Sequence, residues 1–214
     1  MSEIYYQDDL VTLYLGDCLE VPEWLQADVL VTDPPYGMGY SSGWVKGRPE
    51  RAIAGDDDVK ARDAALALWG DGPAIVFGTW RVPKPANVKQ TGIWDKGDDP
   101  GMGDLKMPWG SSFEEFYIFG SGFVGKRGGA VIRAKKPPVN NRPDHPTPKP
   151  VGLMESLIGN TVGTVADPFA GSGSTLLAAR NLGRQSIGVE LEERYCELIA
   201  RRLSQQAFDF AGIA

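Results

Sequence analysis

The stretch "VADPFAGSGSTLLAARNLG", residues 165–183, decides the fold, because an apolar run ends in an aspartate and then passes through two glycines into a helical pattern. Glycines at such a turn let the backbone approach a ligand closely, and the free N–H groups that open the helix attract a carboxylate or phosphate. The next apolar run ends at Glu190, about 20 residues further on, the spacing at which an acid takes up ribose hydroxyls. A site for a nucleoside-containing cofactor is therefore predicted. Leu176 stands where a dinucleotide-binding turn would carry its third glycine.

Further apolar runs of the same build alternate with helical patterns along the chain. Strands are predicted over 11–17, 27–33, 72–79, 163–171 and 186–190, and helices over 58–70, 149–160, 174–183 and 192–206. This alternation predicts an α/β fold with a mostly parallel, doubly wound sheet that binds its ligands at the carboxyl ends of the strands. No helix separates 92–97 from 113–120, so these runs are expected to form an antiparallel pair at one sheet edge.

Composition and length bound the class of protein. With 214 residues, 42% of them apolar, the chain is expected to be a single domain, 1–214. Its two cysteines, Cys18 and Cys196, have no metal-binding or disulfide-framework spacing, so no metal site is predicted. There is no secretory pattern at the N-terminus and no apolar run long enough to span a bilayer, which favours a cytoplasmic protein without membrane contact.

Charge is distributed unevenly, although the net charge is −6. The window 121–150 has seven basic residues and a single acid, Asp144. A basic loop on an acidic body can contact the phosphates of nucleic acid, and a solvated basic loop is the alternative. The stretch 37–58 is the second long loop, and loops of this length in a compact domain are usually functional or disordered.

The stretch "VTDPPYG", residues 31–37, places a carboxylate, two prolines and an aromatic ring behind a strand. Asp33 can accept one N–H of an exocyclic amine while the carbonyl of Pro34 accepts the other. Pro34 and Pro35 hold that carbonyl rigidly, and Tyr36 offers a stacking face to a planar base. A Pro-Pro turn that merely closes a strand is the alternative.

Three motifs together, "DPPY" (33–36), "HPTPKP" (145–150) and "DPFAGSGST" (167–175), resemble the β group of adenine-N6/cytosine-N4 DNA amino-methyltransferases. The resemblance implies a Rossmann-like class I methyltransferase fold with permuted motif order, S-adenosyl-L-methionine as cofactor, double-stranded DNA as partner and a homodimer as one possible assembly. It implies catalytic roles for Asp33, Pro34, Pro35 and Tyr36. The cofactor-binding positions that it implies are Asp17, Cys18, Asp33, Lys149, Asp167, Phe169, Gly171, Gly173, Ser174 and Glu190.

The same resemblance assigns functions to the two long loops. Segment 121–143 occupies the place of a short target-recognition region, and 37–58 is a candidate mobile loop over the active site. The nucleic-acid-binding residues predicted from this segment are Lys126, Arg127, Arg133, Lys135, Lys136 and Arg142. Trp94, Lys96 and either Glu114 or Glu115 are expected near the active face, and His145 either packs or contacts ligand.

The predicted activity is methyl transfer to N6 of a flipped-out adenine in DNA, since "DPPY" in this group leans toward adenine. Three alternatives stay open at this point. They are a cytosine-N4 DNA methyltransferase, a nicotinamide-dependent dehydrogenase and a non-catalytic nucleic-acid-binding protein with a methyltransferase fold.

Overall fold

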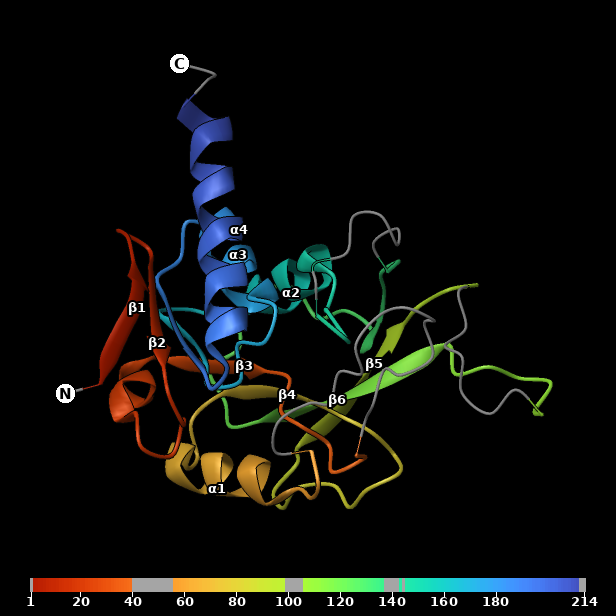
Figure 1. Cartoon of the computed structure of the whole chain (residues 1–214). Coiled ribbons are helices and arrows are strands. Elements are labelled where there is room, and N and C mark those ends of the chain that lie inside the picture. Colours follow the sequence, from red (N-terminus) through yellow and green to blue (C-terminus); the bar gives the residue numbers. More distant parts are fainter. Residues whose placement is uncertain (1, 40–55, 99–105, 137–142, 144, 212–214) are drawn as a thin grey trace.

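The computed structural model describes residues 2–39, 56–98, 106–136, 143 and 145–211, with the side chains of the last helix described as far as residue 205. Within these residues one mixed sheet has the strand order β1-β2-β9-β8-β3-β4-β6-β5-β7 (Figure 1). The strands are β1 (Glu3–Gln7), β2 (Val11–Leu15), β3 (Val29–Thr32), β4 (Ala74–Gly78), β5 (Gln90–Asp95), β6 (Phe113–Phe119), β7 (Val131–Arg133), β8 (Val165–Asp167) and β9 (Ser186–Glu190).

Helices cover both faces of the sheet. The helices are α1 (Lys60–Trp69), α2 (Val151–Ile158), α3 (Ser174–Asn181) and α4 (Glu193–Ala211), with a 3-10 turn η1 at Pro22–Gln26. Figure 1 shows α2, α3 and α4 on one side of the sheet and α1 on the other. Strand β3 contributes Val29 and Val31 to the cluster with α2 and α3, whereas Leu30 packs with Trp24 and Ala65 on the α1 side. Because successive side chains of a strand point to opposite faces, an all-apolar strand is what a doubly wound sheet requires.

Strand directions define one functional edge of the sheet. β2, β9, β8, β3 and β4 are mutually parallel, and their last residues meet at one edge, called here the carboxyl edge. β6 is antiparallel to both β4 and β5, so β5 runs in the same direction as β4, and β7 pairs parallel to β5. The carboxyl edge therefore includes Thr32, Gly78, Asp95, Asp167 and Glu190, as well as the N-terminal end of β6.

The structure differs from the predicted topology in three details. The pair β5–β6 does not lie at the edge of the sheet, because β7 pairs with β5 at Ile93↔Val131 and Asp95↔Arg133. β7 lies inside the segment 121–148, which the sequence pattern indicates as loop. A three-residue strand carries too little periodicity to be recognised, and its partner is some 40 residues away in sequence. The outer strand β1 has no counterpart among the predicted elements.

No helix in the described part of the chain has both the length and the apolar character needed to cross a bilayer. Among the same residues, no group of three or more histidine, cysteine, aspartate or glutamate side chains could hold a metal ion.

Candidate functional site

The turn after β8 is shaped by two glycines with left-handed backbone conformation. Gly171 has φ +51 and Gly173 φ +76, a region that residues with a Cβ rarely adopt. A Cβ on Gly171 would lie 3.1 Å from Nε2 of His145, and one on Gly173 would lie 2.8 Å from Cγ1 of Ile199 in α4. The turn is therefore packed as tightly as its backbone allows, and it opens α3 at Ser174.

Glu190 ends β9 directly behind this turn. Its Oε2 accepts the backbone N–H of Gly171 at 2.8 Å and its Oε1 that of Glu192 at 2.8 Å. Burial raises the pKa of this carboxyl to about 7, although both N–H groups oppose the rise. Each carboxylate oxygen keeps a second lone pair, so Glu190 can still accept the hydroxyl hydrogens of a ribose.

Asp167 connects the glycine turn after β8 to the end of β3, which Asp33 follows. Its Oδ1 accepts the hydroxyl of Thr32 at 2.6 Å and the backbone N–H of Phe169 at 3.2 Å. Burial raises the pKa of Asp167 to about 6. Ser174 is buried at the start of α3, with its hydroxyl 3.1 Å from that of Ser172.

Asp17 and Cys18 follow β2 at the same edge, next to Glu190. The backbone N–H of Gly16 donates to the Glu190 carbonyl at 2.9 Å, which places this turn beside the end of β9. Asp17 is exposed, and its Oδ1 accepts the N–H of Leu19 at 2.9 Å. Cys18 is buried, and burial raises its thiol pKa to about 12, so the thiol is neutral.

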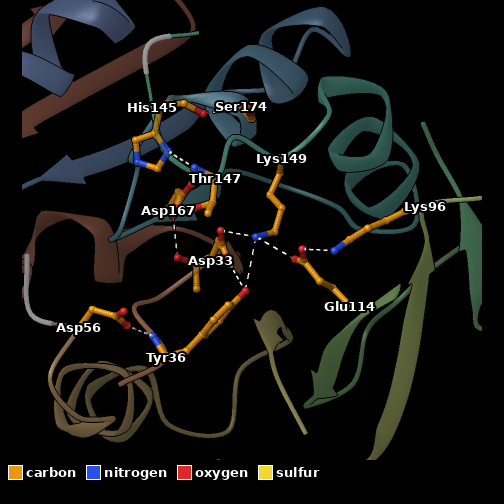
Figure 2. Close-up of polar contacts among 12 residues, drawn as sticks. Asp33, Tyr36, Asp56, Lys96, Glu114, His145, Thr147, Lys149, Asp167 and Ser174 are labelled. Atoms are coloured by element: carbon orange, nitrogen blue, oxygen red, sulfur yellow. Dashed lines mark hydrogen bonds and ion pairs between the residues drawn. The ribbon is translucent and has the colours of Figure 1, made fainter. Parts of the chain in front are cut away.

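Asp33 immediately follows β3, and both of its carboxylate oxygens are engaged. The Tyr36 hydroxyl donates to Oδ1, and the Lys149 ammonium binds Oδ2 (Figure 2). Lys149 Nζ also lies 3.4 Å from the Tyr36 hydroxyl and 5.7 Å from the centre of its ring. Asp33 and Tyr36 thus form one cluster with Lys149, which lies 113 or more positions further along the chain.

Lys149 has a second carboxylate partner, Glu114 of β6. Lys149 Nζ lies 3.1 Å from Oε2 of Glu114, whose Oε1 lies 2.7 Å from Lys96 Nζ. The ammonium group of Lys149 is therefore held by Asp33 and Glu114, two partners that the sequence, from which Lys149 is predicted only as a cofactor-binding residue, did not indicate. The choice between the two glutamates is also decided, because Glu115 accepts from Tyr117 at 2.7 Å instead.

Asp56 is a site residue that sequence reasoning missed. Its carboxylate Oδ1 accepts the backbone N–H of Tyr36 at 2.7 Å and that of Gly37 at 2.8 Å. Asp56 is buried, with 4% of its surface exposed, and its carbonyl accepts the N–H of Gly39 at 2.7 Å. The sequence contains three successive aspartates here, 56–58, and no pattern distinguishes the buried one.

His145 lies against the glycine turn. Its ring meets that of Tyr195 edge-on at 4.7 Å, and its Nδ1 accepts the backbone N–H of Thr147 at 3.3 Å. Its Nε2 lies close to Gly171, so the histidine packs against the glycine turn.

A cavity of about 310 Å³ opens beside Lys149. The first turn of α2 and two further cations line it, and the lining residues are Lys135, Pro143, Lys149, Pro150, Val151, Gly152 and Arg202. The backbone N–H groups of Val151 and Gly152 are the first of the helix, where no intrahelical acceptor exists. These groups give the cavity the chemistry of an anion site.

The basic segment divides between the two edges of the sheet. Arg133 ends β7 at the carboxyl edge, where it pairs with Asp95 at 2.7 Å, and Lys135 and Lys136 follow it. Lys126 and Arg127 precede β7, near Val124, whose N–H donates to the carbonyl of Asn160 beyond the far end of α2. They therefore lie at the opposite edge from Asp33, because strand direction separates the two ends of β7. Arg142 lies outside the described residues, as do 40–55 of the loop 37–58.

Sheet order, layers and glycine turn define the Rossmann-like fold of the class I methyltransferases, as the sequence predicted. Residues 60–201 match the N6_N4_Mtase family model, described as DNA methylase, and the chain belongs to that family. The type II methyltransferase M.ScaI of Streptomyces caespitosus is 39% identical, over 97% of this chain and 86% of its own length.

Two solved structures share the fold. The M1.HpyAVI complex with S-adenosyl-L-methionine superposes with a TM-score of 0.66 and 24% identity, covering 91% of this chain and 99% of that one. The cytosine-N4-specific PvuII DNA methyltransferase has a TM-score of 0.70 and 15% identity, covering 93% of this chain and 88% of that one. The predictions of fold class and family are confirmed, and the family match removes the dehydrogenase alternative.

Proposed function

We propose that this protein transfers a methyl group from S-adenosyl-L-methionine to N6 of a flipped-out adenine in double-stranded DNA. The observation that carries the proposal is the placement of Asp33 and Tyr36 at the carboxyl edge, joined through Thr32 and Asp167 to the glycine turn. One short stretch of sheet edge therefore offers both a cofactor turn and an acceptor for an amine.

The donor set fits the cofactor. Glu190 at the end of β9 suits the ribose hydroxyls, and Asp17 on the neighbouring turn suits the adenine amino group. Gly171 and Gly173 give the turn the left-handed backbone conformation that lets a chain pass close to a ligand. The cavity beside α2 suits the methionine carboxylate, since the first helical N–H groups, Lys149 and Arg202 line it. When bound, the cofactor supplies an electrophilic methyl group on a sulfonium.

The chain's own residues orient the nucleophile. The target amine needs an acceptor for one N–H, and Asp33 offers Oδ1 once the Tyr36 hydroxyl releases it. The carbonyl of Pro34 accepts the other N–H, which directs the nitrogen lone pair away from the base plane. As the N–C bond forms and the methyl–sulfur bond breaks, positive charge grows on nitrogen beside the Asp33 carboxylate. The departing proton then passes to Asp33 or to water.

Tyr36 has two tasks in this scheme. Its ring supplies the stacking face for the flipped base, and its hydroxyl holds Asp33 in the absence of DNA. Asp56 fixes the backbone of Tyr36 and Gly37, so the ring is presented from a firm turn.

Adenine is preferred over cytosine because the motif is Asp-Pro-Pro-Tyr, which in the family that it resembles leans toward adenine. The cytosine-N4 alternative is supported by the fold of the PvuII enzyme, whose own specificity is cytosine-N4. Incubation of unmethylated DNA with protein and cofactor, followed by digestion to nucleosides and mass spectrometry, separates the two. N6-methyl-2′-deoxyadenosine is expected, and N4-methyl-2′-deoxycytidine would overturn the choice of base.

Catalysis by Asp33 has a direct test. Asp33→Ala is expected to lower methyl transfer at least a hundredfold while cofactor binding, followed by calorimetry, changes less than threefold. An Asp33→Ala protein that methylates DNA at the wild-type rate would favour the remaining alternative, a DNA-binding protein in which this site does no chemistry.

DNA is proposed to lie along the carboxyl edge, in contact with Arg133, Lys135 and Lys136. The chain offers a charge-matched control, because Lys126 and Arg127 lie in the same segment but at the opposite edge. The double variant Lys135→Ala/Lys136→Ala is expected to weaken DNA binding about tenfold. It should also reduce the slope of the logarithm of the binding constant against the logarithm of the salt concentration by about two. The double variant Lys126→Ala/Arg127→Ala is expected to change neither quantity. Equal effects of the two pairs would contradict this DNA face.

The remaining sequence predictions belong to the same proposal. One domain over 1–214, target recognition by 121–143, a mobile loop at 37–58, a homodimer and a cytoplasmic location stay predictions.

A further inference from the structure

Two buried lysines and two partly buried carboxylates form a chain of charges that ends at Asp33. Lys96, the residue after β5, lies 2.7 Å from Glu114 of β6, Glu114 lies 3.1 Å from Lys149, and Lys149 binds Asp33 (Figure 2). Only 7% of the Lys96 side chain and 6% of the Lys149 side chain are exposed. The chain contains two positive and two negative groups, so each charge is compensated by a neighbour in a place that water reaches poorly.

Strand pairing fixes the order of these charges. Glu114 stands directly opposite Trp94 in the β5–β6 ladder, and Lys96 lies two residues beyond Trp94 on the same face, its Nζ 5.1 Å from the centre of the tryptophan ring. The backbone N–H of Lys96 donates to Ser112 at 2.8 Å, which continues the ladder past the end of β5. The carboxylate of Glu114 is therefore held from two sides by rigid elements.

We propose that Glu114, oriented by Lys96, is a positioning residue for methyl transfer: it holds the Lys149 ammonium beside Oδ2 of Asp33 and leaves Oδ1 for the target amine. The inference rests on the proposed function. Lys149 has three N–H donors and two carboxylate partners, so its direction is set only while both are present. Without Glu114, the ammonium of Lys149 binds Asp33 alone and draws more of its negative charge away from the amine.

Each of the other three charges in the chain is expected to move the pKa of Asp33 in a definite direction. The groups that face Asp33 are Lys149, Glu114, Tyr36 and, through β8, Asp167. Burial raises the pKa of Asp33, Lys149 lowers it and Glu114 raises it. Removal of the Glu114 charge is therefore expected to move the Asp33 titration to lower pH, and removal of the Lys96 charge, which frees Glu114 to act on Lys149 alone, to higher pH.

The central experiment compares Glu114→Gln with Glu115→Gln. Glu115 is the adjacent residue of the same strand, but it points to the other face and pairs with Tyr117 and Lys84. Glu114→Gln is expected to lower kcat at least tenfold, with KM for the cofactor within threefold of wild type and the acid limb of the kcat profile at lower pH. Glu115→Gln is expected to keep kcat within twofold and the profile unchanged.

A readout without turnover separates this inference from the proposed function. Carbon-13 NMR of the Asp33 carboxyl in the protein alone is expected to report a lower pKa in Glu114→Gln and a higher one in Lys96→Met. If wild type shows no methyl transfer but the NMR shifts appear, the proposed function fails and the coupling stands. If Glu114→Gln does not fold, Lys96→Met alone decides: an unchanged Asp33 titration overturns the inference, as does a shift to lower pH.

Discussion

Replacement of Asp56 by alanine tests whether a single buried carboxylate presents Tyr36 to the target base. The change removes the acceptor of two backbone N–H groups, those of Tyr36 and Gly37 at 2.7 and 2.8 Å. The N–H of Gly39 keeps its partner, because it donates to the backbone carbonyl of residue 56. The variant therefore loosens the turn without removing the whole contact between the two segments.

The magnitude follows from the lost hydrogen bonds. Each buried N–H left without an acceptor costs about 1–3 kcal/mol, but Tyr36 and Gly37 are half-buried, so water replaces part of the loss. We expect the lost hydrogen bonds to shift the conformational equilibrium of this turn by about 2 kcal/mol toward conformations in which Tyr36 is misplaced. This shift corresponds to a roughly 30-fold lower kcat. Asp56→Asn keeps an oxygen acceptor and is expected to lose only about threefold, since the hydrogen bond to a neutral acceptor is weaker.

Single-turnover transfer of labelled methyl to DNA measures the effect, with cofactor affinity followed separately by calorimetry. Asp57→Ala is the matched control, because the next residue in the chain is exposed, and it is expected to behave as wild type. An Asp56→Ala protein with kcat within twofold of wild type would refute the reasoning. A parallel loss of cofactor affinity would show that the substitution acts on the fold and not on the turn.

Further predictions concern the cofactor turn and the tyrosine. Glu190→Gln should weaken cofactor binding at least tenfold in calorimetry. Burial holds the wild-type pKa of Glu190 at about 7, above its value in the unfolded chain, so the wild-type protein should lose about 3 kcal/mol of unfolding free energy as the pH rises from 4.5 to 7. The Gln variant should not show this loss in urea titrations. Gly173→Ala, at φ +76 with its new Cβ against α4, should lower the unfolding free energy by about 2–3 kcal/mol, and Gly128→Ala, in open space, by less than about 1. Tyr36→Phe should retain kcat within threefold since the ring remains, whereas Tyr36→Ala should lose about 1–3 kcal/mol of base stacking in a DNA-binding assay with an extrahelical base.

Local sequence patterns were sufficient to predict the strands and helices whose own residues have a strong apolar pattern. The runs that became β2, β3, β4, β8 and β9 are apolar and β-branched over four or more positions, or end at an aspartate or glutamate, and the helices between them were predicted within a few residues. The elements that were missed, β1 and β7, are outer strands with little apolar pattern. Their pairing with β2 and β5 depends on neighbours that only the assembled sheet supplies.

By itself the sequence determined the fold class and the family, and it supplied the motif residues that we propose for catalysis and cofactor binding, because these depend on short stretches whose residues are adjacent in the chain. Only the tertiary structure decided what those residues touch. It assigned Lys149 to Asp33 and Glu114, separated Glu114 from Glu115 by the alternation of β6, and divided the basic segment between two edges by the direction of β7. The physical reason is that charge pairing and strand direction join positions up to 116 residues apart, and no local pattern records such contacts.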